Sequence, residues 1–155
     1  MISSVANQSF TTADGPTAMS NSTITNRGYL TTGTVFNAAS NIRVRIPSTF
    51  DMVWGSGDTT ATITGEATTK IYSNESTQTI LCGAPPCSAT VTYEDMNRTV
   101  VIWVGTDFAA SDTLTIANLS FDPGTTIESV DNLELEVLND GVVQDEDDKT
   151  IEVGA

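Results

Sequence analysis

The sequence predicts an all-β protein that folds as a single antiparallel β-sandwich of about 8 to 11 strands. Apolar and polar residues alternate with a period of two along most of the chain, and no segment carries a helical stripe. Turn residues recur about every ten positions, and Thr, a strand former, is the commonest residue. A length of 155 residues is typical of one domain, so residues 1–155 are expected to share one core.

The first 40 residues are less hydrophobic than the rest, and we expect one or two edge strands there. Their main apolar anchors are Phe10, Ile24, Leu30, Val35 and Phe36.

The central part of the chain carries clear strand patterns. Residues 42–46 place three apolar side chains on one face and two arginines on the other, and Pro47 ends this strand. Apolar and polar residues also alternate in residues 50–54 and 59–64, and Gly65 marks a turn after the second of these strands. A further short strand is predicted at 69–72. The remaining single strands are predicted at 113–116, 119–121, 133–137 and 150–153.

Residues 89–93 and 98–104 flank a polar turn at 94–97 and predict a hairpin. The second of these strands is apolar on both faces. It is therefore either a central strand covered on both sides or an exposed apolar ridge, formed by Val101 and Trp103, that awaits a partner.

Several stretches of the sequence resemble one class of protein. They read NIRVRIPSTFDMVW, TTATITG, VTYEDMNRTVVIWVGTDFAASDTLTIANLSF, DNLELEVLNDG and DDKTIEV. Over most of residues 41–153 the chain resembles the tandem β-sandwich modules, Ig-like or cohesin-like, of large secreted and surface-anchored microbial proteins. We expect the sandwich to be Ig-like or jelly-roll-like. The resemblance implies an Ig-like or cohesin-like shape, and its motifs are core and turn residues that specify fold better than function. The chain departs from the pattern in lacking an internal repeat and in carrying the insertion CGAPPC.

Charge and composition exclude several functions. The formal net charge is −14 and the pI is about 4.1, which argues against binding to nucleic acid and to anionic membrane surfaces. No apolar run approaches the roughly 20 residues that span a bilayer, so no membrane insertion is expected. The chain contains no His, which excludes His-based acid–base catalysis and imidazole metal sites. We therefore expect no enzymatic activity.

The two cysteines, Cys82 and Cys87, are separated by four residues that include a Pro-Pro pair. This spacing allows a disulfide, whereas two thiolates alone cannot complete a tetrahedral zinc site. Free thiols are the alternative. A disulfide would indicate an oxidising compartment, and hence an extracellular or cell-surface location.

Acidic residues gather near the C-terminal end in Asp145, Asp147 and Asp148. Asp-rich loops between strands can bind calcium, because that ion prefers carboxylate and carbonyl oxygens. The alternative is a solvated acidic loop without a cofactor. The preceding Asn139-Asp140-Gly141 is a turn signal in its own right.

Two features of the sequence concern glycans. Five Asn-x-Ser/Thr sequons make glycosylation an open question, namely those at Asn7, Asn21, Asn74, Asn97 and Asn118. Trp54 and Trp103 would provide a stacking platform if the protein binds sugar, although both alternate with core positions and core packing is the other interpretation.

The N-terminal segment, residues 2–10, has no charge, no Pro and no Gly, and so lacks the features that usually protect an edge strand. Its apolar residues are Ile2, Val5, Ala6 and Phe10. Residues 1–12 are expected to be either the first strand of the chain's own sandwich or an arm that adds a strand to a neighbouring subunit.

Together these observations predict a non-enzymatic extracellular structural module. The first hypothesis is a homo-oligomeric, self-assembling subunit of a surface filament, pilus-like fibre or surface layer, built by donor-strand complementation. The alternative is a glycan- or protein-binding adhesin module, or a passive spacer of a larger surface protein.

Overall fold

The computed structural model describes residues 1–27, 41–137 and 141–155. The predicted anchors Leu30, Val35 and Phe36 and the turn residues Asn139 and Asp140 lie outside the described residues. The described part of the protein is nearly all β, with 48% of the described residues in strands and 4% in helix, which confirms the predicted all-β class.

The described residues form thirteen strands and one short 3-10 helix, η1 (Glu66–Lys70). The strands are β1 (Ile2–Ser4), β2 (Gln8–Thr11), β3 (Thr17–Ala18), β4 (Ser22–Thr25), β5 (Ile42–Arg45), β6 (Val53–Trp54), β7 (Thr60–Thr64), β8 (Cys87–Glu94), β9 (Thr99–Ile102), β10 (Thr113–Ala117), β11 (Ser120–Asp122), β12 (Glu128–Glu136) and β13 (Asp145–Gly154).

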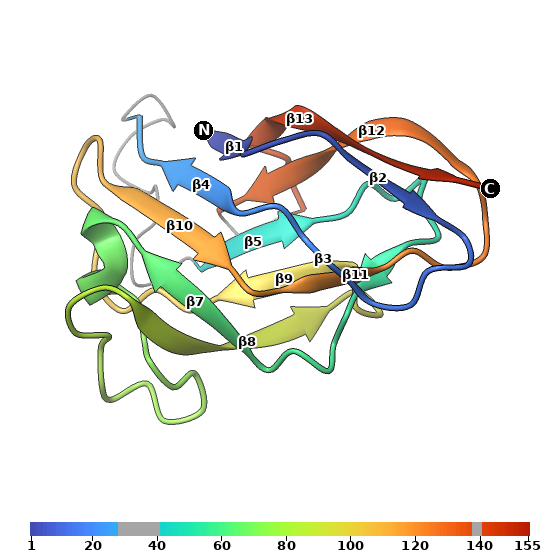
Figure 1. Ribbon diagram of the computed structural model, residues 1–155. Coiled ribbons are helices and arrows are strands. Elements are labelled where there is room, and N and C mark those ends of the chain that lie inside the picture. Colours follow the sequence, from blue (N-terminus) through green and yellow to red (C-terminus); the bar gives the residue numbers. More distant parts are fainter. Residues whose placement is uncertain (28–40, 138–140) are drawn as a thin grey trace.

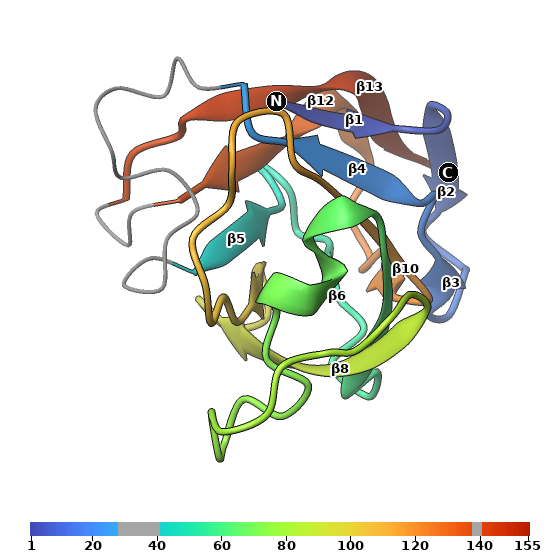
Figure 2. The same cartoon turned by 90° about the vertical axis from the view of Figure 1, so that its left-hand side faces the viewer.

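Ten strands form one sheet in the order β1-β4-β10-β7-β8-β9-β5-β12-β13-β2, and three form a small sheet in the order β3-β11-β6. The large sheet curls around an apolar interior (Figures 1 and 2). Strand β8 makes one of the bends, because residues 87–90 pair with β7 whereas residues 91–94 pair with β9. The curl brings β1, at one end of the strand order, beside β13 near the other end.

The core fills the interior of this sheet and comes from the apolar positions that the period of two predicts. Trp54 is 1% exposed, and its ring lies 4.6 Å from that of Phe121 between centroids. Its Nε1 donates to the carbonyl of Val44 at 3.2 Å. Trp54 therefore packs in the core and is not a surface platform for sugar.

The N-terminal region is more regular than expected. Residues 1–27 alone contain four strands, where one or two were predicted for the first 40 residues. Two of the thirteen strands, β3 and β6, have only two residues each, too few to produce a visible alternation. One pairing is also parallel, that of β2 with β13, so the large sheet is not purely antiparallel.

The predicted strand at 69–72 is wrong, because η1 occupies residues 66–70 and only Ile71 and Tyr72 make isolated bridges. Gly65, at a φ of 103°, starts the helical turn, and its carbonyl accepts hydrogen bonds from the backbone N–H and hydroxyl of Thr68. These local bonds outweigh the strand preference of the two threonines at 68 and 69.

The acidic run is also placed differently. Residues 145–148 belong to strand β13 and are not a loop, since β13 extends from Asp145 to Gly154 and pairs with β12. The predicted hairpin at 89–104 is present as β8 and β9, with Asp95, Met96 and Asn97 at positive φ in its turn.

Candidate functional site at the N-terminal strands

Strand β1 lies between β4 and β13, and it is held differently on its two sides. On one side it pairs with β4 in an antiparallel ladder in which Ile2 opposes Ile24 and Ser4 opposes Ser22. Ile2 and Ile24 are both fully buried. Burying such side chains contributes about 1.5–3 kcal/mol each relative to leaving them exposed, so the ladder side of β1 is anchored in the core.

On the other side β1 meets carboxylates in place of a backbone ladder. Asp145 Oδ2 accepts a hydrogen bond from the Ile2 backbone N–H at 3.0 Å, and Asp147 Oδ1 accepts one from the Ser4 N–H at 2.8 Å. The two aspartates are two residues apart on β13, so both side chains reach the same neighbour. We call Asp145, Asp147 and Asp148 the carboxylate clasp, because the third carboxylate accepts from the Ser3 hydroxyl at 2.8 Å.

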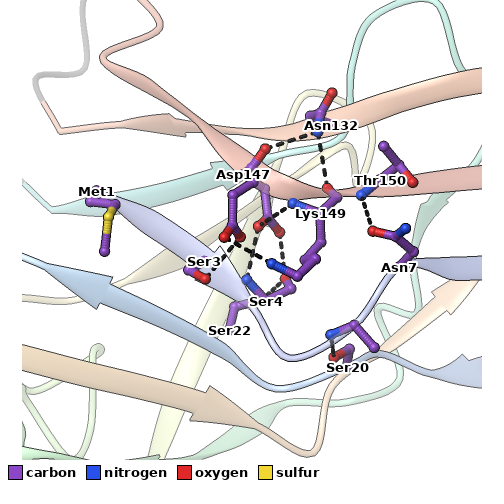
Figure 3. A network of polar contacts seen from close by, with 12 residues as sticks. Met1, Ser3, Ser4, Asn7, Ser20, Ser22, Asn132, Asp147, Lys149 and Thr150 are labelled. Atoms are coloured by element: carbon purple, nitrogen blue, oxygen red, sulfur yellow. Dashed lines mark hydrogen bonds and ion pairs between the residues drawn. The ribbon is translucent and has the colours of Figure 1, made fainter.

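Asp147 is the most enclosed member of the clasp, at 4% exposed. Its carboxylate also accepts hydrogen bonds from the Ser4 hydroxyl and from the Lys149 backbone N–H, the latter at 3.1 Å. Because the Ser4 hydroxyl hydrogen points to Asp147, the Ser22 hydroxyl 2.7 Å away is the donor to Ser4 Oγ. A buried carboxylate with this many donors is fully compensated for its loss of water (Figure 3).

Asn132 on β12 holds the part of β13 that carries the clasp. Its side-chain amide donates to the carbonyls of Asp147 at 2.8 Å and Lys149 at 3.1 Å, both on β13. These bonds bridge an irregular part of the β12–β13 pairing, where the register shifts between Asn132 and Glu134. Asn132 therefore fixes the segment of β13 that presents the clasp to β1 (Figure 3).

Two groups at the site have pKa values that are shifted by their immediate neighbours, Asp148 and the Met1 amino group. The pKa of Asp148 is lowered, first by its hydrogen bond with the Lys149 ammonium and then by the Ser3 hydroxyl. Burial lowers the pKa of the Met1 amino group, and the nearby Asp145 carboxylate partly opposes this. The Met1 nitrogen donates to the Thr25 carbonyl at 2.9 Å.

The chain then crosses from β1 to β2 along the same neighbour. Asn7 Oδ1 accepts a hydrogen bond from the Thr150 backbone N–H at 3.1 Å, and after it β2 pairs in parallel with residues 151–154 of β13. Phe10 is 4% exposed, and its ring makes an edge contact with Phe121 at 5.5 Å between centroids. Residues 2–11 therefore follow β13 over its length, first through side chains and then through backbone bonds.

In this structure the predicted assembly segment pairs with its own chain. Of its four apolar residues, Ile2 and Phe10 are buried, whereas Val5 is 74% exposed and Ala6 is also exposed at the kink between the strands. This is the intramolecular arrangement of the two that the sequence left open. Exchange of the same segment between copies stays a prediction.

The structure brings the predicted calcium ligands to one edge, but each carboxylate of the clasp contacts a different residue of β1. Among residues 1–27, 41–137 and 141–155 there is no group of three or more acidic or cysteine side chains arranged to hold a metal. The sequence-based signal for the role seen here is the spacing of two between Asp145 and Asp147 on an alternating strand.

The other predicted positions are dispersed. Cys82 and Cys87 form a disulfide with 5.9 Å between their Cα atoms. Val101 is fully buried between Arg43 and Thr92 on the neighbouring strands, so it forms no exposed ridge. Trp103 is half-buried, and its Nε1 donates to Thr92 Oγ1 at 2.9 Å.

The buried position of Val101 follows from an ion pair that sequence reasoning missed. The Arg43 guanidinium donates twice to Glu94, at 2.9 and 3.2 Å, and Arg43 is only 5% exposed. Its aliphatic part therefore lies along the outer face of the sheet, where Val101 is its cross-strand neighbour.

The described part of the chain contains no helix long and apolar enough to cross a membrane. No protein-family model matches the sequence, and neither the curated proteins nor the solved structures yielded a significant match.

Proposed function

We propose that this chain is a non-enzymatic extracellular structural module that assembles with copies of itself into a surface filament, pilus-like fibre or layer. Assembly would proceed by exchange of the N-terminal segment 1–12 between neighbouring copies. The observation that carries this proposal is the way in which residues 2–11 are bound to the rest of the sheet.

Residues 2–11 are held mainly by bonds from the strands β4 and β13. Smaller contributions come from the nearer residues Asp14, Ser20 and Asn21. The same bonds are available to the same segment of a second copy, because they depend on the register and not on the connection. Residues 12–16, which include Gly15 and Pro16, link the segment to β3 and are largely exposed. An exposed connection of this kind is a suitable hinge for exchange.

The architecture supports the proposal at the level of the sheet. We interpret the curled sheet as the two facing layers of a sandwich, joined where β8 changes partners and where β1 gives way to β2. Removing β1 would uncover one edge of β4 and the clasp on β13. Such a groove accepts one strand in one register, which suits specific polymerisation.

The disulfide supports an extracellular site of action, since disulfides persist in oxidising environments. The high negative charge supports a structural role that does not involve nucleic acid. The absence of His from the sequence supports the non-enzymatic part of the proposal.

Deletion of residues 1–10 tests the proposal directly. The truncated chain should form no polymers in negative-stain images, whereas the full chain forms fibres or a lattice under the same conditions. Because Ile2 and Phe10 leave the core in this variant, a synthetic peptide of residues 1–10 is added in a parallel sample to restore the fold without linking copies.

Assembly by strand exchange is contradicted if the truncated chain still polymerises, or if it does not fold even with the peptide present. A full chain that stays monodisperse would also contradict it, and would favour the binding-module or spacer alternative.

A further inference from the structure

One loop of the molecule plays no part in the proposed assembly site. The segment between Ile71 and β8 extends away from the curled sheet on the side opposite to β1 (Figure 2). It is ordered by its own bonds: the Ser73 N–H and hydroxyl both donate to the Ile80 carbonyl, at 2.9 and 3.0 Å. The disulfide Cys82–Cys87 closes the end of the loop that leads into β8.

The loop carries one of the five sequons, Asn74-Glu75-Ser76, and its geometry differs from that of the others. Asn74 Oδ1 accepts a hydrogen bond from the Ser76 hydroxyl at 2.7 Å and another from the Ser76 backbone N–H at 3.0 Å. A backbone N–H can only donate, so the accepting atom is the amide oxygen and the Nδ2 group points the other way. Both Asn74 and Ser76 are exposed.

In the other four sequons the Ser or Thr hydroxyl is engaged elsewhere. Ser9 Oγ donates to Glu152 at 2.5 Å, Thr23 shares a hydrogen bond with Thr115 at 2.8 Å, Thr99 donates to Asp95 at 2.7 Å and Ser120 donates to Asp58 at 2.6 Å. All four of these hydroxyls belong to residues of the sheets. None of them bonds to the Asn of its own sequon.

Two of these Asn side chains are also occupied at the nitrogen that would carry a glycan. Asn97 Nδ2 donates to Ser56 Oγ at 3.3 Å, and Asn118 Nδ2 donates to Thr62 Oγ1 at 2.6 Å. Asn7 lies where β1 gives way to β2 and binds the β13 backbone. Asn21 immediately precedes β4, and its carbonyl accepts from Val5.

We infer that Asn74 is the N-glycosylation site of this chain. Its carboxamide is held by the sequon hydroxyl on an exposed loop, with Nδ2 directed to solvent and bound to no described residue. A sequon is recognised as Asn-x-Ser/Thr in surface loops of secreted proteins, and here the folded chain keeps that unit intact and accessible.

The reaction would join Asn74 Nδ2 to the anomeric carbon of a sugar supplied as a glycosyl phosphate or pyrophosphate donor by a transferase. The N–C1 bond forms, and the bond from C1 to the phosphate oxygen breaks. The phosphate leaves with the electron pair, and one Nδ2 proton passes to a base of the transferase.

Peptide mapping by mass spectrometry tests the inference on protein isolated from the cells that naturally make it. The peptide that contains Asn74 should carry a glycan mass, located to Asn74 by fragmentation that preserves the sugar. The variants Ser76→Ala and Ser76→Thr, made in the same cells, should lose and keep this mass respectively. Asn21→Gln, the matched control at another sequon, should leave it unchanged.

An unmodified Asn74 peptide in the natural protein overturns the inference, whether or not another sequon is occupied. So does a Ser76→Ala variant that keeps the glycan. These outcomes are independent of assembly, because they are measured on the chain that retains residues 1–10 and because the bonds that order the loop come from residues 73–90.

Discussion

At the scale of single residues, Asp147 is the side chain on which the position of β1 depends most. Its carboxylate is nearly inaccessible to water and accepts three hydrogen bonds, two of them from Ser4. Hydrogen bonds to an ionised acceptor contribute more than neutral ones, about 1.5–3 kcal/mol. The neighbouring Asp148 makes similar bonds at the surface, where water replaces them at little cost.

The substitution Asp147→Asn should therefore lower the free energy of unfolding by about 1–2 kcal/mol, because the N–H groups of Ser4 and Lys149 then bond to a neutral amide oxygen, a weaker acceptor than a carboxylate. Urea unfolding of the wild type and the variant measures the change. Asp148→Asn is the control and should leave the free energy of unfolding nearly unchanged, because Asp148 is exposed and water replaces its hydrogen bonds. Equal effects of the two substitutions would mean that Asp147 does not hold β1.

Tyr93 provides a pH-dependent prediction. Burial, together with the nearby Asp58 carboxylate, raises its pKa from 10.0 to about 12, and its hydroxyl donates to the Asp58 carbonyl at 2.5 Å. A pKa raised by folding means that the neutral phenol stabilises the folded state. This contribution is complete below about pH 10 and is lost as the pH rises toward about 12.

The free energy of unfolding should therefore fall between pH 10 and 12 by about 1 kcal/mol more in the wild type than in Tyr93→Phe, a value reduced because Tyr93 is half-exposed. Chemical unfolding at a series of pH values measures this difference. If the two proteins lose stability in parallel, Tyr93 titrates normally.

At the scale of elements, β1 combines a buried anchor with an exposed residue one position past its end. Ile2 is fully buried opposite Ile24, whereas Val5 is 74% exposed. Ile2→Ala should reduce the free energy of unfolding by about 2–5 kcal/mol, because it leaves a cavity in the core. Val5→Ala should change it by less than about 0.5 kcal/mol. Thermal unfolding of both variants compares them, and a similar loss in both would show that β1 is not docked as described.

The elements also show how far the sequence predicts the fold. Strands with a regular period of two, such as 42–45 in β5 and 60–64 in β7, were predicted close to their observed bounds. The helical turn at 66–70 was missed because its Thr-rich sequence favours a strand, while the bonds to the Gly65 carbonyl that decide the outcome are local and invisible to periodicity.

The candidate site could be predicted only in part, because it depends on contacts between residues far apart in sequence. The uncharged N-terminal segment and the acidic run were each identified, but as separate features. Their contact joins residues 143 positions apart, as in the bond from Ser4 N–H to Asp147, and no short-range pattern reports a pairing of that separation. The alternation of Asp145 and Asp147 was masked by Glu146 and Asp148 between and beside them, which made a strand look like a charged loop.

At the scale of the whole molecule, residues 2–11 join the two ends of the strand order. Strand β1 is first and β2 is last, and consecutive residues of one segment therefore tie β4 to β13. A sheet closed in this way has few free edges as a monomer. Exchange of the segment between copies would keep every edge covered while linking the copies in a chain, which is the central claim of the proposed function.

A pair of cysteines placed across the β1–β4 ladder tests that claim most directly. Ser4 and Ser22 oppose one another with their hydroxyl oxygens 2.7 Å apart, so Ser4→Cys combined with Ser22→Cys should form a disulfide without moving the backbone. The native pair Cys82–Cys87 is already bonded, and Ser4→Cys alone serves as the control. After assembly and oxidation, strand exchange predicts a ladder of covalent oligomers on a non-reducing denaturing gel, whereas a cross-linked monomer alone, recovered from assembled material, would contradict it.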